Sequence, residues 1–108
     1  MKVKTSELTG AALDWAVAKA WQPVYSDGAL LTTVQGGYHP STNWEQGGLI
    51  IQREKIGVGY TTDGGETWLS AMSDDPCYTS GVTPLVAAMR CYCCKKLGNE
   101  VDLPEELT

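Results

Sequence analysis

The sequence predicts an α+β fold in which an antiparallel β-sheet of about four or five strands carries an N-terminal and a C-terminal helix packed on it. Three observations support this class. Apolar residues repeat with helical spacing near both ends of the chain, and short β-rich runs separated by turn residues occupy the middle. The 108 residues can bury one core but not two. We therefore expect a single domain, 1–108, in which 100–108 form an acidic C-terminal tail.

Start and stop signals bracket the two expected helices. The first begins after Thr9, a good N-cap, and ends at Pro23. Its apolar face consists of Leu13, Ala16, Val17 and Ala20. The second begins at Thr83 and Pro84, because threonine can cap a helix and proline is favoured at its first position. Gly98 is the expected stop.

Between the helices, β-rich runs alternate with turn formers. Asp27 and Gly28 suit a tight hairpin turn, and Asp63 to Gly65 suit another. In the segment 73–82 apolar residues follow neither the helical nor the strand spacing, so we expect a loop there. The expected strands are 24–26, 29–34, 49–51, 58–61 and 66–72.

Charge and hydropathy limit the partners. Thirteen acidic residues against eight basic ones give a net charge of −5, and the basic residues are scattered, so we expect no direct nucleic-acid binding. No stretch approaches the roughly 20 apolar residues that span a bilayer, and the first residues do not form a signal peptide. We expect no membrane association, a cytoplasmic location, and a chain that folds alone or as a small homo-oligomer.

One segment, residues 36–48, combines paired glycines with aromatic and small polar residues. Glycines let a backbone approach a ligand closely, aromatic rings can stack on a ring, and a helical turn begun at a proline can hold an anion. An arginine beside it would capture a phosphate with two hydrogen bonds. The expected ligand-binding residues are Tyr38, Pro40, Ser41, Thr42, Trp44, Gln46, Arg53 and Arg90. The alternative is a structural connector, in which Trp44 fills the core and Ser41 caps a turn.

The other reactive residues favour structural roles. Cys91, Cys93 and Cys94 crowd within one expected helix, which is not a zinc-ligand spacing, and the only histidine is His39. We interpret the cysteines as small buried residues of a reduced protein. His39 has no nucleophile or carboxylate at a spacing that implies a partner. We therefore expect no catalytic residue, metal site or cofactor.

Three blocks of sequence, in order, resemble the NinX family of small proteins from lambda-like phages and related prophages. The blocks are MKVKTSELTGAALDWAVAKA (1–20), PSTNWEQGGLIIQREKI (40–56) and TPLVAAMRCY (83–92) followed by 96–98. The chain differs from the family pattern at Leu49, where members tend to have proline, and at Gln52, where they tend to have glutamate. A wider group of phage proteins with an α-β-α sandwich is similar, and the resemblance implies a sheet with helices packed on it.

Two functions follow from the residues and the resemblance. The first is a non-enzymatic phage accessory protein that binds a small molecule, sequestering a nucleotide-like host signal in counter-defence within the host cytoplasm. The second is an acidic protein-interaction module or inhibitor of a host protein, a function that the acidic C-terminal residues suggest. Those residues are Glu100, Asp102, Glu105 and Glu106. An enzyme is retained only because sites assembled from distant residues leave no pattern in a sequence.

Overall fold

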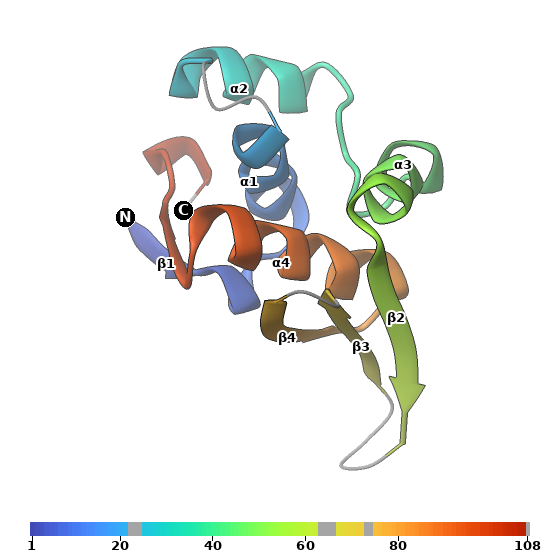
Figure 1. The fold of residues 1–108 in the computed structure, drawn as a ribbon. Helices are drawn as coiled ribbons and strands as arrows, with labels where there is room; N and C mark the ends of the chain where they lie inside the picture. Colours follow the sequence, from blue (N-terminus) through green and yellow to red (C-terminus); the bar gives the residue numbers. More distant parts are fainter. Residues whose placement is uncertain (22–24, 63–66, 73–74, 108) are drawn as a thin grey trace.

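The computed structural model describes residues 1–21, 25–62, 67–72 and 75–107 (Figure 1). Within these residues lie four α-helices, five strands and two short 3₁₀ turns at Thr5–Glu7 and Glu105–Leu107. The helices are α1 (Gly10–Trp21), α2 (Asp27–Gln35), α3 (Trp44–Glu54) and α4 (Pro84–Leu97). The strands are β1 (Lys2–Lys4), β2 (Ile56–Thr61), β3 (Thr67–Met72), β4 (Asp75–Gly81) and β5 (Glu100–Asp102). The α+β class and the five strands are confirmed, but the strands form two antiparallel sheets, β1–β5 and β2–β3–β4.

Helix α4 is the centre of the molecule (Figure 1). Its residues are buried on almost every side, as expected for a helix surrounded by other elements. The Thr83 hydroxyl accepts a hydrogen bond from the Val86 amide at 3.1 Å, and Gly98 ends the helix at a φ of 87°. The predicted start and stop of this helix are both confirmed.

The other elements form layers on the two sides of α4. The sheet β2–β3–β4 packs on one side of it, and α1 packs on the other, with α2 lying across α1 (Figure 1). Close approach of the sheet depends on Gly81, where a Cβ would come within 2.7 Å of the Ala87 backbone nitrogen. The core lies where α1 meets α4, around Trp15, Met89 and Tyr92.

The segment expected to form a first hairpin is instead helix α2, so that prediction is wrong. Ser26 caps the helix by accepting a hydrogen bond from the Ala29 amide at 3.2 Å. The hydroxyls of Thr32 and Thr33 donate to carbonyl groups four residues earlier, at 3.1 and 3.0 Å, which accommodates β-branched residues in a helix. Pro23, Val24 of the strand expected at 24–26, and the turn 63–65 lie outside the described residues. Tyr25 and Ser26 form no strand.

The strand expected at 49–51 is also wrong, because these residues belong to helix α3. Asn43 caps it by accepting from the Gln46 amide at 3.1 Å. The apolar run does not share one face: Ile50 is buried, whereas Leu49 is 63% exposed. Close packing requires glycine at position 47, because a Cβ there would collide with the Pro40 carbonyl oxygen.

The predicted strand 58–61 is confirmed as part of β2, and the strand 66–72 is confirmed as β3 over its described residues, 67–72. The loop expected at 73–82 is wrong over most of its length, because 75–81 form strand β4. This strand lies at the edge of its sheet, the position in which a proline such as Pro76 is tolerated. One register shift, between Ser70 and Met72, interrupts the pairing of β3 with β4.

The described part of the acidic segment, residues 100–107, lies against the domain. Strand β5 pairs with β1 in register Val3 to Val101, and the side chains of Val101 and Leu103 are buried. The N-terminal ammonium donates to Asp102 Oδ1 at 2.8 Å, and this hydrogen bond holds the pKa of that carboxyl below its usual range. The two ends of the chain therefore lie side by side (Figure 1).

Candidate functional site

The connector between α2 and α3, residues 36–43, is fixed by hydrogen bonds at both of its ends. Gln46 holds the first part, since its Oε1 accepts from the His39 amide at 2.7 Å and its Nε2 donates to the Gly37 carbonyl at 3.2 Å. Asp14 of α1 holds the second part by accepting from the Ser41 amide at 2.9 Å. The path of the connector is thus set by two side chains outside it.

Asp14 is a buried carboxyl, 5% exposed. Burial raises its pKa, while hydrogen bonding from Ser41 and the electrostatic interaction with His39 oppose that rise. The Ser41 hydroxyl lies close enough to influence this pKa but makes no hydrogen bond of good geometry to any described residue. The main interaction between the two residues is therefore the amide hydrogen bond, which carries the connector.

A pocket of about 260 Å³ opens between α1, α2 and the connector. Three aromatic side chains, Trp21, Tyr25 and Tyr38, contribute to its wall. The remaining lining residues are Ala18, Leu30 and Thr33. Burial raises the pKa of Tyr38 to about 12, so its phenol is protonated at neutral pH and can donate a hydrogen bond.

Arg53 of α3 lies against the wall of this pocket. Its guanidinium carbon is 3.4 Å from the centroid of the Trp21 ring, a cation–π contact. Its Nε also pairs with Glu54 at 3.0 Å, and Lys96 approaches the same carboxylate at 3.6 Å. The Arg53 side chain is 52% exposed, so part of the guanidinium faces solvent beside the aromatic wall. An apolar hollow with a cation beside it suits a flat ring that carries a negative group.

Only part of the predicted site is brought together. Among the described residues, Tyr38 lines the pocket and Arg53 stacks on its wall. Four other predicted residues belong to the connector or to its support: Pro40 and Ser41 are buried, Gln46 makes the hydrogen bonds above, and Thr42 bonds back to His39 at 3.3 Å. For these four the alternative of a structural connector describes the geometry better.

Trp44 and Arg90 do not join this pocket. Trp44 is 59% exposed on α3 and does not fill the core, which also excludes the structural role considered for it. Arg90 donates from Nε to the Leu8 carbonyl at 2.8 Å and from Nη1 to the Ser80 carbonyl at 2.7 Å. Arg90 therefore ties the N-terminal turn to strand β4.

Trp21 and Tyr25, the other two aromatic residues that line the pocket, are not among the binding residues predicted from the sequence. They flank Pro23, at the end of the first predicted helix and the start of the next segment. Two aromatic side chains close together in the sequence, near the end of a predicted helix, could have indicated a shared aromatic surface.

The cysteines form no metal site within the part of the chain that the structure describes. Cys91 and Cys93 carry buried thiols, and burial raises the pKa of Cys93 well above its usual value, which opposes nucleophilic chemistry. Cys94 is disulfide-bonded, so the interpretation of the cysteines as reduced residues is wrong there. The side chain of Cys77 lies outside those described.

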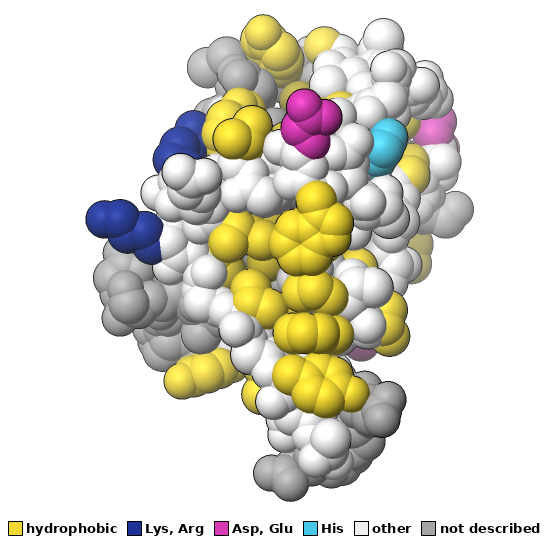
Figure 2. All heavy atoms as spheres, turned by 90° about the vertical axis from the view of Figure 1, so that its right-hand side faces the viewer, with side chains coloured by type: hydrophobic (Ala, Val, Ile, Leu, Met, Phe, Trp, Pro, Cys, Tyr) yellow, Lys and Arg dark blue, Asp and Glu magenta, His cyan; other side chains and the backbone are white. Residues whose placement is uncertain are grey.

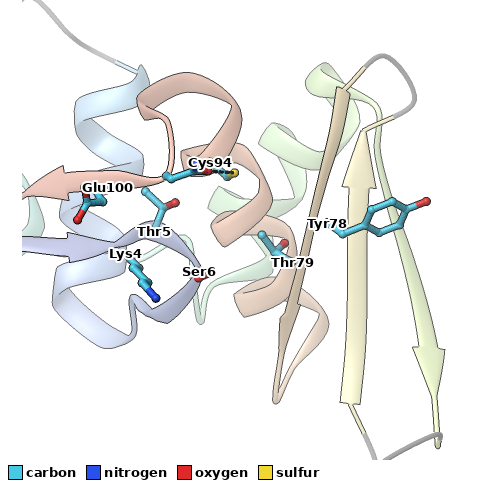
Figure 3. A pocket seen from close by; sticks show the side chains of 8 residues that line it. Lys4, Thr5, Ser6, Tyr78, Thr79, Cys94 and Glu100 are labelled. Carbon is cyan, nitrogen blue, oxygen red and sulfur yellow. Dashed lines mark hydrogen bonds between the residues drawn. The ribbon is translucent and has the colours of Figure 1, made fainter.

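A larger hollow, of about 530 Å³, lies between the two sheets (Figure 3). Its two threonine hydroxyls are already bonded within the fold, Thr5 to the Gly98 carbonyl at 2.9 Å and Thr79 to the Ala87 carbonyl at 2.8 Å. Figure 3 shows Tyr78 pointing away from α4 at one side of this hollow. Its remaining lining residues are Lys4, Ser6, Cys94, Asn99 and Glu100. The aromatic pocket, with a cation against its wall, is the better candidate site.

No helix within the described ranges is both long and apolar enough to cross a membrane. Among known proteins, the sequence matches the family described as Bacteriophage P22, NinX, over residues 4–96. No curated protein matches the chain.

Proposed function

Since the chain belongs to the NinX family and is thus a phage accessory protein, we propose that it acts without catalysis, by binding a small nucleotide-like host molecule. In this proposal the protein sequesters a host signal in the cytoplasm of the infected cell, as a means of counter-defence. Stoichiometric capture requires affinity and abundance but no reacting groups.

The aromatic pocket is the observation that carries this proposal. Its volume of about 260 Å³ is at the small end for ligand sites and fits one ring system rather than a whole dinucleotide. Trp21, Tyr25 and Tyr38 supply surfaces on which a base can stack, and the phenol of Tyr38 can donate to a ring nitrogen or carbonyl. The phosphate would lie outside the pocket, where Arg53 can pair with it in place of Glu54.

The absence of catalysis is part of the proposal. Two titratable groups in this region have a structural partner or are held in an unreactive form: Asp14 accepts a hydrogen bond from the connector, and the phenol of Tyr38 is protonated at neutral pH. Neither is poised as a general base. Binding therefore accounts for this arrangement better than chemistry.

Thermal unfolding with a panel of nucleotides and cyclic nucleotides tests the proposal. A ligand at one hundred times its Kd adds about 2.7 kcal/mol of stability, which raises Tm by about 10 °C or more for a domain of this size. Trp21→Leu should remove the shift, whereas the matched variant Trp44→Leu should keep it, because Trp44 lies outside the pocket. Arg53→Gln should weaken phosphorylated ligands more than nucleosides. If no member of the panel raises Tm, or if both tryptophan variants respond alike, the pocket is not a nucleotide site.

The acidic C-terminal segment favours a second function, an interaction module or inhibitor directed at a basic host protein. Its four acidic side chains are exposed, while Val101 and Leu103 anchor the same segment to the domain. A fixed acidic surface can enter the basic groove of a nucleic-acid enzyme. Capture of a basic host protein at low salt, lost on Glu105→Lys with Glu106→Lys, would support this function. Unchanged capture by the charge-reversed variant would exclude it.

A further inference from the structure

Strand β2 lies at an edge of the sheet β2–β3–β4, and no other described strand pairs with its outer side. Natural proteins protect such edges with charged residues, proline or bulges, because an open edge can bind another strand. The strand Ile56–Thr61 contains no charge and no proline, and its pairing with β3 runs without a bulge from Ile56 to Thr61. The outer edge of β2 therefore lacks these protections against pairing with a strand of another molecule.

The residues of β2 repeat in a pattern that reads the same in both directions. Ile56, Val58 and Tyr60 alternate with Gly57 and Gly59, so apolar residues occupy one face of the strand and glycines the other. When such a strand pairs antiparallel with its own copy, each apolar residue meets an apolar residue and each glycine meets a glycine. A partner of different sequence would not gain this match.

We infer that two copies of this chain pair through β2, antiparallel, about a twofold axis at Val58. In this register Val58 faces the partner's Val58, Ile56 faces the partner's Tyr60, and Gly57 faces the partner's Gly59. The two three-stranded sheets then form one continuous sheet of six strands, with both copies of α4 on the same face. A twofold contact of this kind is isologous, so the same surface serves both copies.

The apolar surface beside β2 fits the same partner. Exposed apolar side chains continue from α3 along the hairpin, and Figure 2 shows them gathered in one strip, with the charged side chains at its margins. The exposed large apolar residues of α3 and β2 are Trp44, Leu49, Val58 and Tyr60. The ring of Tyr60 also lies against that of the half-buried Trp68 of β3, with ring centroids 4.9 Å apart. Two copies that each carry a net charge of −5 repel one another, so association is least opposed where the facing surface is uncharged. This strip is such a surface.

Sedimentation velocity over a range of protein concentrations tests the inference. The wild-type chain should sediment as a dimer of twice the monomer mass of 11.6 kDa. Val58→Lys places two like charges together at the axis and should raise the dimer Kd at least about tenfold. Val82→Lys is the matched control, since Val82 is 85% exposed and lies outside β2, and it should leave the dimer unchanged. A wild-type chain that remains monomeric at high concentration overturns the inference, and so does a dimer that Val58→Lys leaves intact.

A cross-link tests the register without depending on the folding of the lysine variant. In Val58→Cys, mild oxidation should join two chains through position 58, because residues that face each other on the axis bring their Cβ atoms within about 4.5–5.5 Å. Val82→Cys should not form this link. Failure of Val58→Cys to link faster than Val82→Cys would overturn the proposed register.

Discussion

Replacement of Asp14 tests whether one buried carboxyl positions the connector and, through it, the wall of the pocket. In Asp14→Ala the Ser41 amide loses its acceptor in a site that water does not reach, since Asp14 is 5% exposed. A hydrogen bond to a charged group contributes about 1.5–3 kcal/mol, and an unsatisfied buried donor costs a similar amount. We expect Asp14→Ala to lower the free energy of unfolding by about 3 kcal/mol.

Asp14→Asn separates the hydrogen bond from the charge. The asparagine oxygen can still accept from the Ser41 amide, and its amide group can donate toward the Ser41 hydroxyl. We therefore expect this variant to stay within about 1 kcal/mol of the wild type at pH 7, because it also removes the cost of burying a charge.

The pH dependence of stability gives a second readout. The pKa of Asp14 is raised by burial above its value of 3.8 in the unfolded chain, so the folded state binds the proton more tightly. Its contribution to stability is therefore fully present below pH 3.8 and is lost as the pH rises through the folded pKa. The wild type should gain stability relative to Asp14→Asn as the pH falls from 7 toward 4.

Urea unfolding followed by tryptophan fluorescence measures both effects at each pH, and ligand-induced shifts in Tm report on the pocket. Asp14→Ala should also weaken binding, because Tyr38 lies on the connector that this residue holds. If the alanine and asparagine variants lose equal stability, or if the alanine variant loses less than about 0.5 kcal/mol, the hydrogen bond does not position the connector.

Three further substitutions have clear expectations. Gly47→Ala should cost about 2 kcal/mol or more, because the new methyl group collides with the Pro40 carbonyl, whereas Gly48→Ala, with open space around it, should stabilise the helix by about 0.5–1 kcal/mol. Equal thermal unfolding of the two variants would contradict this reasoning. Arg90→Met should cost about 2–4 kcal/mol, since both carbonyl groups that the arginine bonds lose a charged donor. A Tm within about 2 °C of the wild type would show that Arg90 does not tie these segments together.

The helix ends near 83 and 98 could be predicted because they depend on the local backbone preferences of the residues found there. Thr83 caps the helix and Pro84 fits its first turn, whatever the helix packs against. Helix α2 could not be predicted in the same way, because the run Thr32, Thr33 and Val34 has strong β-propensity. Its helical form depends on side-chain hydrogen bonds to the preceding turn and on burial of Leu30 against α1, and neither is visible in a linear pattern.

The site illustrates the same limit. The sequence does not distinguish the roles of Arg53 and Arg90. In the structure Arg53 stacks on Trp21, whereas Arg90 donates hydrogen bonds to two carbonyl groups elsewhere in the molecule. The segment 36–48 can be recognised from its turn formers, and its conformation places Tyr38 in the pocket. The other pocket residues come from α1, from α2 and from Tyr25 just before α2, and the packing of these elements cannot be read from a linear pattern.

The central place of α4 has a consequence for how the chain folds during synthesis. The ribosome produces α1, α2, α3 and β2–β4 before it produces residues 84–97, yet α1 and the three-stranded sheet bury their apolar faces against that helix. Until it emerges, these earlier segments have no core to complete and leave their apolar surface in water. We therefore expect nascent chains arrested before residue 84 to remain open to protease and chaperone, and folding to be a late event completed by the arrival of a single helix.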